Sequence, residues 1–402
     1  MDILIKNAAE LVTLKGPNTP RTKKHMSQLA SIKNGCVAID QGKIVDIGKN
    51  LKYSADTVID ATGKTVMPGF VDPHTHVVFA GSREFELDMK LKGLSYMEIL
   101  KQGGGIYYTV DQTRRASEQE LIRQSTQRLN NMLSYGTTTC EAKSGYGLST
   151  DSELKILKVQ QQLNSQHPMD IVSTFLGAHA IPKNMDADQY VDLIIHQMLP
   201  KVKGLVYFCD VFCEQGVFNV AQSQRILEAG KKVGLTPKLH ADEIVDTGGA
   251  ALAAKIGAIS ADHLLKAANT GLRQMAQQGV IGVLLPGTPF SLMQKTYAKA
   301  RQMIDLGIPL ALATDLNPNC WTESMQFIIQ LACLQMKMTP AEAVTAATFN
   351  AACAIQRNDQ VGSLEHGKQA DLVILNCHNH QCIPYHFGIN LVSTVIKQGK
   401  MI

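Results

Sequence analysis

The central part of the chain, residues 67–355, alternates short apolar runs with longer stretches in which apolar residues recur at helical spacing. Seven of these runs have the length of a β-strand, and an eighth strand is expected immediately before His74. The seven runs are residues 137–141, 171–175, 207–212, 236–240, 258–262, 280–285 and 309–313. Helical patterns lie between them, for instance at residues 117–135, 151–166 and 223–233. Eight β/α units over roughly 290 residues predict an α/β fold, a (β/α)8 barrel of the TIM type.

The main alternative is an open, doubly wound parallel sheet. Such a sheet usually carries a glycine-rich fingerprint after its first strand, and the sequence has none at that position. We therefore expect the closed barrel.

The two ends of the chain differ from the middle. Residues 35–48 predict a β-hairpin with two apolar runs around an Asp-Gln-Gly-Lys turn, and residues 362–375 and 392–400 also combine short apolar runs with glycines. Each end alone is too short to enclose a core. We therefore predict that residues 1–66 and 356–402 together form a small β-sandwich domain, and that residues 67–355 form the barrel domain.

Polar residues that suit metal binding or proton transfer recur at the carboxyl ends of the predicted strands. In a barrel of this type the active site lies at that end. A single histidine there would be unremarkable, because a lone histidine is more often a core or surface residue than a ligand. The repetition is what favours a site. The residues are His74, His76, Glu141, His179, Glu214, His240, His263 and Asp315.

His74 and His76 are two residues apart and follow an apolar run at residues 65–67, which we expect to belong to the same strand. On a strand, residues i and i+2 point to the same face and are able to bind one metal ion. With His240 and Asp315 they would supply three neutral nitrogens and one carboxylate, a set that suits zinc or iron. A metal there would lower the pKa of a bound water, and Asp315 would be in reach to accept its proton. His263 is a second candidate for proton transfer or for binding the oxyanion.

These motifs resemble those of the amidohydrolase superfamily. The resemblance rests on residues 68–76, on His240, His263 and Asp315, and on residues 362–375. Longer strings resemble the superfamily members that open an imidazolone ring in histidine degradation. These strings are residues 79–83, 103–106, 141–148, 176–179, 240–243 and 314–318. The resemblance covers nearly the whole chain and implies metal-dependent hydrolysis of the cyclic amide of 4-imidazolone-5-propanoate to N-formimidoyl-L-glutamate.

The resemblance also implies roles for side chains around the metal. Arg83 would bind the substrate carboxylate, for which a planar guanidinium is well suited. Tyr146 and His179 would contact the imidazolone ring. Glu243 would bind a ring nitrogen or move a proton during ring opening, and Asn317 would be a further substrate contact.

The sequence departs from the superfamily pattern just after Asn317. Asn319 and Cys320 stand where a glycine and then a serine or threonine are expected. A backbone contact from Asn319 is compatible with the change, because asparagine tolerates unusual φ angles. A hydroxyl contact at Cys320 is not, because a thiol is only a weak donor. Both positions remain candidates for substrate binding.

Composition argues against other classes of function. The net charge is +4 and the basic residues are scattered, whereas a nucleic-acid surface needs a basic stripe. No run of 18 apolar residues is present and the first residues do not resemble a signal peptide, so we expect no membrane association. Nine dispersed cysteines predict reduced thiols and a cytoplasmic location.

Two rival functions use the same residues. A metal-dependent deaminase of an aminated heterocycle would share the metal ligands, but purine and pyrimidine bases carry no carboxylate to pair with Arg83. A catalytically inactive relative should have lost ligands, and all four are present. The ligand set accepts either Zn2+ or Fe3+, one ion per subunit, and the superfamily resemblance favours a homodimer.

Overall fold

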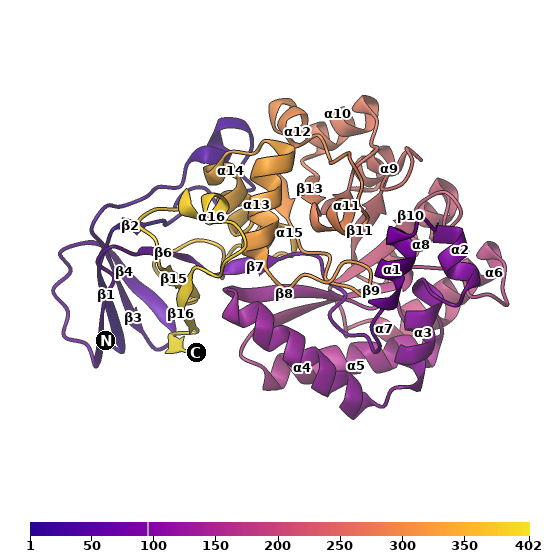
Figure 1. Ribbon diagram of the computed structural model, residues 1–402, viewed down its shortest axis with the longest axis horizontal. Coiled ribbons are helices and arrows are strands. Elements are labelled where there is room, and N and C mark those ends of the chain that lie inside the picture. The colour runs from indigo at the N-terminus through magenta and orange to yellow at the C-terminus, as the bar shows by residue number, and fades with distance from the viewer. Residues whose placement is uncertain (95) are drawn as a thin grey trace.

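The computed structural model describes residues 1–94 and 96–402. Its largest sheet has eight strands in chain order, and each strand runs parallel to its neighbour. The strands are β7 (Phe70–Asp72), β8 (Thr137–Lys143), β9 (Asp170–Ala178), β10 (Phe208–Cys213), β11 (Thr236–Ala241), β12 (Ser260–His263), β13 (Ile281–Leu284) and β14 (Leu310–Leu312). Helices cover the outside of this sheet (Figure 1). The α/β barrel predicted from the sequence is therefore confirmed.

The first and last strands meet beyond their carboxyl ends. Thr75 forms a parallel bridge with Leu316, the Asp315 N–H donates to the His74 carbonyl at 3.1 Å, and the His76 N–H donates to the Leu316 carbonyl at 2.9 Å. This seam brings two predicted ligand segments, distant in sequence, into direct backbone contact.

The prediction for the first strand was wrong in one respect. Residues 65–67 do not belong to a barrel strand but to β6 (Thr65–Pro68) of a second sheet, while His74 and His76 follow the end of β7. Gly69 separates the two strands, and a Cβ there would lie only 2.3 Å from Oγ1 of Thr138. The chain thus crosses from one sheet to the other at a position where only glycine fits.

The helices follow the expected patterns. The predicted helices at 117–135, 151–166 and 223–233 correspond to α4 (Glu118–Ser134), α5 (Thr150–Gln166) and α8 (Val220–Lys232). Ser117 caps α4 by accepting a hydrogen bond from the Glu120 N–H. The other helices are α1 (Phe85–Leu91), α2 (Tyr96–Lys101), α3 (Ile106–Arg115), α6 (Ala187–Leu193), α7 (Leu199–Val202), α9 (Gly249–Ile256), α10 (Asn269–Gln278), α11 (Gly287–Ser291), α12 (Ala300–Leu306), α13 (Met325–Met336), α14 (Pro340–Ala346), α15 (Phe349–Ala354), α16 (Cys382–Tyr385), a 3-10 turn η1 (Lys23–Ser27) and a π-helical turn η2 (Ile194–Met198). None of the helices in the described part of the chain is long and apolar enough to cross a membrane.

The two ends of the chain form two mixed sheets that pack on a shared apolar core. We call these two sheets together the sandwich. One sheet has the order β4-β3-β1-β5 and the other β17-β16-β15-β6-β2. Their strands are β1 (Ile3–Ala8), β2 (Glu10–Leu11), β3 (Gly35–Asp40), β4 (Lys43–Lys49), β5 (Thr57–Asp60), β15 (Leu372–Leu375), β16 (Val392–Lys397) and β17 (Lys400–Met401). The predicted hairpin at 35–48 is β3–β4, turning through Gln41 and Gly42, which both have positive φ. The division into domains at residues 66/67 and 355/356 stays a prediction.

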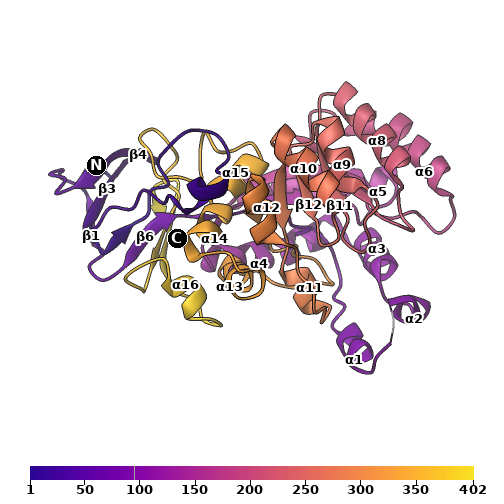
Figure 2. The same ribbon diagram turned by 90° about the horizontal axis from the view of Figure 1, so that it is seen from above.

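The sandwich covers the amino ends of the first barrel strands. Gln369 donates to the carboxylate of Asp170, the first residue of β9, at 2.8 Å, and a Cβ at Gly136, just before β8, would lie 3.0 Å from Val373. The carboxyl ends of the barrel strands therefore point away from the sandwich, and both chain termini lie at the sandwich end of the molecule (Figure 1). Helices α1 and α2 project from the barrel at the end of the molecule away from the sandwich (Figure 2).

Candidate active site

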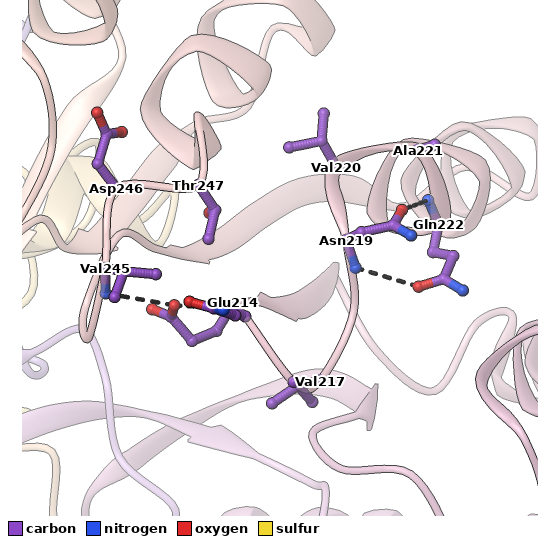
Figure 3. Close-up of a pocket in the computed structure, with 11 residues that line it drawn as sticks. Glu214, Val217, Asn219, Val220, Ala221, Gln222, Val245, Asp246 and Thr247 are labelled. Carbon is purple, nitrogen blue, oxygen red and sulfur yellow. Dashed lines mark hydrogen bonds between the residues drawn. The ribbon is translucent and has the colours of Figure 1, made fainter.

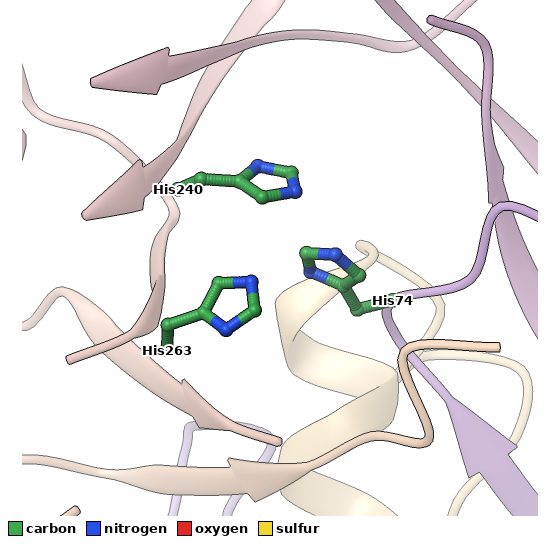
Figure 4. A group of neighbouring side chains, drawn as sticks. All are labelled: His74, His240 and His263. Carbon is green, nitrogen blue, oxygen red and sulfur yellow. The ribbon is translucent and has the colours of Figure 1, made fainter. Parts of the chain in front are cut away.

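Five histidines and one aspartate converge at the carboxyl end of the barrel. Three of them, His74, His240 and His263, come from different strands or strand ends and point toward one space (Figure 4). The ring centroids of His74 and His240 are 4.5 Å apart, and those of His240 and His263 are 5.3 Å apart. Asp315 lies beside them, with Oδ1 3.5 Å from Nε2 of His74 and 3.6 Å from Nε2 of His76.

The donor atoms form three overlapping groups in which all atoms lie within 4.8 Å of one another. The groups are His74–His240–His263, His76–His179–His240 and His74–His76–Asp315. In the described structure, Nε2 of His74, Nε2 of His240 and Nδ1 of His263 are buried without a hydrogen-bond partner. A buried polar atom left unpaired costs free energy, and a metal ion would remove that cost. Nitrogen donors with one carboxylate suit zinc or iron, so the residues fit such an ion.

Burial sets the protonation of these ligands. It lowers the pKa values of His74, His76 and His263 well below the ordinary value, which leaves each ring neutral and able to bind a metal. His240 differs. Burial would lower its pKa too, but the carboxylate of Asp210, 3.0 Å from Nδ1, outweighs burial and raises the pKa.

Asp315 is held in place by a residue that the sequence analysis did not single out. The Thr288 hydroxyl donates to Oδ2 of Asp315 at 2.6 Å, which leaves Oδ1 facing the histidines. Burial raises the pKa of Asp315 to about 6, although the Thr288 hydrogen bond opposes that shift. Asp315 also has a φ of 54°, a left-handed conformation that aspartate adopts more readily than most residues.

The two predicted ring contacts lie against a predicted metal ligand. The His179 ring stacks on the His76 ring with centroids 4.8 Å apart and an angle of 11°. Tyr146 lies 5.2 Å from His179 and 5.6 Å from His76, measured between ring centroids. The loop that carries Tyr146 is fixed by Glu153, which sequence reasoning missed.

Glu153 is fully buried at the start of α5 and points its carboxylate back into that loop. It accepts hydrogen bonds from the N–H groups of Gly145 at 2.9 Å, Gly147 at 2.7 Å and Leu148 at 2.8 Å. One buried side chain thus satisfies three backbone donors. An acidic residue soon after a glycine-rich loop was the only signal available in the sequence.

Arg83 precedes α1 and is buried. Its Nε and Nη2 atoms donate to the two oxygens of Glu86 at 2.7 and 2.9 Å, and Glu86 also accepts from the Gly105 N–H at 2.6 Å. A Cβ at Gly104 would lie 2.9 Å from Glu86 Oε1, so glycine permits this close approach. The pairing occupies one edge of the guanidinium and does not involve Nη1.

Glu243 and His263 lie near each other, with 3.7 Å between Glu243 Oε2 and His263 Nε2. Loss of contact with water, reinforced by the Asp315 charge, raises the pKa of Glu243 to about 8. The backbone after Glu243 is held by Glu214, which accepts from the N–H groups of Ile244 and Val245 at 2.8 and 3.3 Å. Figure 3 shows Glu214 and Val245 on one side of a surface pocket that does not include the histidines.

Comparison with known proteins identifies the family. A model described as "Amidohydrolase family" matches residues 220–402, and a second one with that description matches residues 57–99. The chain is 54% identical to the imidazolonepropionase of Alkaliphilus metalliredigens (strain QYMF), over 100% of this chain and 98% of the relative. It is 55% identical to that of Geobacillus kaustophilus (strain HTA426), over 100% and 97%. The chain belongs to the imidazolonepropionase family of amidohydrolases.

More distant structures share the fold of this imidazolonepropionase family member. An adenosine deaminase from Xanthomonas campestris with bound zinc matches with a TM-score of 0.76 at 19% identity, over 100% of this chain and 92% of that chain. The A. niger ochratoxinase matches with a TM-score of 0.72 at 17% identity, over 99% and 95%. At these identities the likeness concerns the fold alone.

The segment after Asp315 forms a tight turn organised by Asn317. The Asn317 amide donates to the Asp315 carbonyl at 2.8 Å, and its oxygen accepts from the N–H groups of Asn319 at 2.7 Å and Cys320 at 3.1 Å. The buried Cys320 thiol lies 3.5 Å from the Thr314 carbonyl, and burial raises its pKa. The Asn319 side chain accepts a hydrogen bond from Lys90 at 2.9 Å, which joins this turn to α1.

Proposed function

We propose that the chain hydrolyses the cyclic amide of 4-imidazolone-5-propanoate and releases N-formimidoyl-L-glutamate. The observation that carries the proposal is the convergence, in a member of this family, of metal donors with two aromatic rings: His179 stacks on His76, and Tyr146 lies tilted beside both. A neutral aromatic surface next to a metal suits a flat heterocycle better than an extended peptide.

His74, His76, His240 and Asp315 would hold one Zn2+ or Fe3+ per subunit. When bound, such an ion polarises a carbonyl group and lowers the pKa of water. The unpaired buried nitrogens of His74 and His240 support this assignment.

The side chains of this enzyme then move the protons. Asp315, with a pKa of about 6, is largely ionised near neutral pH and accepts a proton from the attacking water. The water oxygen bonds to the ring carbonyl carbon, the ring C–N bond breaks, and the proton passes to the departing nitrogen. Glu243, with a pKa of about 8, is protonated at the same pH and donates a hydrogen bond to a ring nitrogen while keeping its proton. His263 lies 3.7 Å from Glu243 and stabilises the developing oxyanion.

Substrate orientation falls to a second set of residues. Arg83 pairs with the propanoate carboxylate while Glu86 holds its other edge. Tyr146 and His179 contact the ring, and Asn317 contacts the substrate beside Asp315. At Asn319 and Cys320 we propose contacts through the backbone carbonyl oxygens, because both N–H groups donate to Asn317 and the Cys320 thiol is turned toward the Thr314 carbonyl.

The test is direct. Metal-loaded protein is incubated with 4-imidazolone-5-propanoate, and loss of its ultraviolet absorbance is followed. We expect turnover that stops on chelation of the metal and returns when zinc or iron is restored. Absence of turnover by the metal-loaded protein would disprove the proposal, and ammonia release from an aminated heterocycle would instead support a deaminase.

Two further properties belong to this proposal. We place the enzyme in the cytoplasm, supported by nine cysteines that are all unpaired in the described structure. We also propose a homodimer, on the resemblance to the superfamily. Light scattering on the purified protein tests the second point, and a mass of one chain would contradict it.

A further inference from the structure

A buried ionic layer lies inside the barrel, among the strands that carry the candidate metal ligands. We define it as Glu141, Lys143, Asp210, Lys238 and Asp262, whose side chains are all fully inaccessible to solvent. At its centre is Lys143 of β8. Its Nζ lies 2.7 Å from Asp210 Oδ2, 3.0 Å from Glu141 Oε2 and 3.5 Å from Asp262 Oδ2. Three carboxylates thus surround a group that has three N–H donors.

Two of these carboxylates also contact histidines of the metal group. Oδ2 of Asp210 lies 3.0 Å from Nδ1 of His240, and Oδ2 of Asp262 lies 2.6 Å from Nδ1 of His74. These are the same oxygen atoms that face Lys143. One ammonium therefore lies between two carboxylate–histidine contacts whose carboxylates come from β10 and β12, the two strands that flank β11.

The second oxygen of each carboxylate is tied to its own strand. The Val211 N–H donates to Oδ1 of Asp210 at 2.7 Å, and the Ser260 hydroxyl donates to Oδ1 of Asp262 at 2.7 Å. Each carboxylate is fixed at both oxygens, so its plane and the facing histidine ring have one preferred orientation. With Nδ1 of His74 occupied in this way, its Nε2 atom faces the metal group.

Stability alone is a weak reason for such a layer. Buried charges lose their hydration, and apolar residues of similar volume often serve a core equally well. In metal sites, by contrast, a carboxylate behind a histidine fixes the ring and its tautomer, and changing it lowers metal affinity by about 10- to 100-fold.

We propose that Lys143 is a positioning residue for the metal group: it holds Asp210 and Asp262, which orient His240 and His74. This inference rests on the metal site of the proposed function, and it goes further by assigning a role to a lysine that touches neither metal nor substrate.

The test compares two matched pairs of variants. Lys143→Gln is paired with Lys397→Gln, because Lys397 is also buried between two carboxylates, Asp170 and Asp371, each at 2.6 Å. Asp262→Asn is paired with Asp371→Asn, since Asp371 is a buried carboxylate whose ion pair is with a lysine. Zinc dissociation constants are measured by competition with a chromophoric chelator, and the visible spectrum of the Co2+-substituted protein reports ligand geometry.

We expect Lys143→Gln and Asp262→Asn to bind zinc about 10- to 100-fold more weakly and to shift the Co2+ bands. The Lys397→Gln and Asp371→Asn variants should keep wild-type values even if they unfold more easily. Normal zinc affinity with an unchanged Co2+ spectrum in folded Lys143→Gln would overturn the inference.

If Lys143→Gln does not fold, Asp210→Asn and Asp262→Asn decide the matter: the inference requires both to weaken zinc binding, and wild-type affinity in either one refutes it. A wild-type protein that binds neither zinc nor cobalt would give a different pattern. In that case the proposed metal site itself fails, and the positioning role fails with it.

Discussion

Two buried lysines of this enzyme have similar surroundings and different consequences. Lys143 lies inside the barrel, 2.7 Å from Asp210 and 3.5 Å from Asp262. Lys397 lies where the sandwich meets the barrel, 2.6 Å from Asp371. In the barrel, Asp210 and Asp262 contact histidines as well as the lysine. At the junction, the carboxylates link the sandwich to Asp170 at the start of β9.

The same contrast holds for histidines paired with carboxylates. His74 lies 2.6 Å from Asp262 in the barrel, and His380 lies 3.0 Å from Glu10 in the sandwich. The other nitrogen of His74 is buried and unpaired within the described structure and faces other donors. Identical pair chemistry therefore does not distinguish a functional site from a structural contact. What distinguishes the functional site is that His74, once paired with Asp262, keeps a second ring nitrogen that is buried and unpaired within the described structure.

The largest effect should come from removing this second ring nitrogen, Nε2 of His74. His74→Ala should lower metal affinity by more than about 100-fold, because changes to outer partners alone cost about 10- to 100-fold, and activity should fall with metal content. Metal analysis of the purified variant and the absorbance assay measure both. The matched control is His380→Ala, which should keep its metal. Full metal content in His74→Ala would show that His74 is not a metal ligand and would contradict the comparison with His380.

A second prediction concerns Arg83, whose pairing with Glu86 occupies one edge of the guanidinium and does not involve Nη1. Arg83→Lys should raise KM for the substrate by about 10- to 100-fold with a much smaller change in kcat, because a forked, charge-assisted contact is lost. The control is Arg123→Lys, since Arg123 forms the same two-bond fork with Glu120 on the exposed face of α4. A lower kcat at unchanged KM would instead place Arg83 in the chemical step.

The third effect is on stability at the site. Glu153→Ala leaves three buried N–H groups without an acceptor and should reduce the free energy of unfolding by about 3 kcal/mol, at roughly 1 kcal/mol for each donor. Urea denaturation measures it. Glu120→Ala, on the exposed face of α4, should leave the midpoint unchanged. Equal midpoints for Glu153→Ala and wild type would show that the Tyr146 loop does not depend on this carboxylate.

The smallest effect belongs to the sandwich. Burial would raise the pKa of Glu10, but hydrogen bonds from His380 outweigh it and the pKa is lowered from 4.5. Because the pKa of Glu10 is lower in the folded chain than in the unfolded chain, its carboxylate stabilises the fold at pH values above the unfolded-state pKa. This contribution is lost as the pH falls through the folded-state pKa. Glu10→Gln should cost about 1 kcal/mol at neutral pH, and the difference from wild type should disappear in acid. A difference that is equal at both pH values would rule out the contact between the Glu10 carboxylate and His380 as its cause.

Most of the barrel was predictable because local pattern determines it. Each apolar run became a strand, and the polar residues just beyond those runs gathered at one edge because parallel strands end together. The error at residues 65–67 has a physical cause: an apolar run suits a sandwich strand as well as a barrel strand, and the sequence does not say which sheet completes its pairing.

The supporting residues were not predictable in the same way. Thr288 lies 27 residues from Asp315, and Lys143 lies 67 residues from Asp210. Their contacts depend on which strands become neighbours around the barrel, and no local spacing encodes that. Glu86 was closer to detection, since it follows Arg83 by three residues, but an acid at that spacing is common on helices.

The position of the sandwich has a practical consequence. Because it covers the amino ends of the first barrel strands and carries both termini, a tag or linker at either end emerges on the side away from the carboxyl ends of those strands (Figure 1). Immobilisation of the enzyme on a sensor or a resin through Met1 or Ile402 should leave the carboxyl ends of the barrel strands, where the candidate metal donors lie, facing the solution. Turnover by such a tethered protein should match that of the free enzyme.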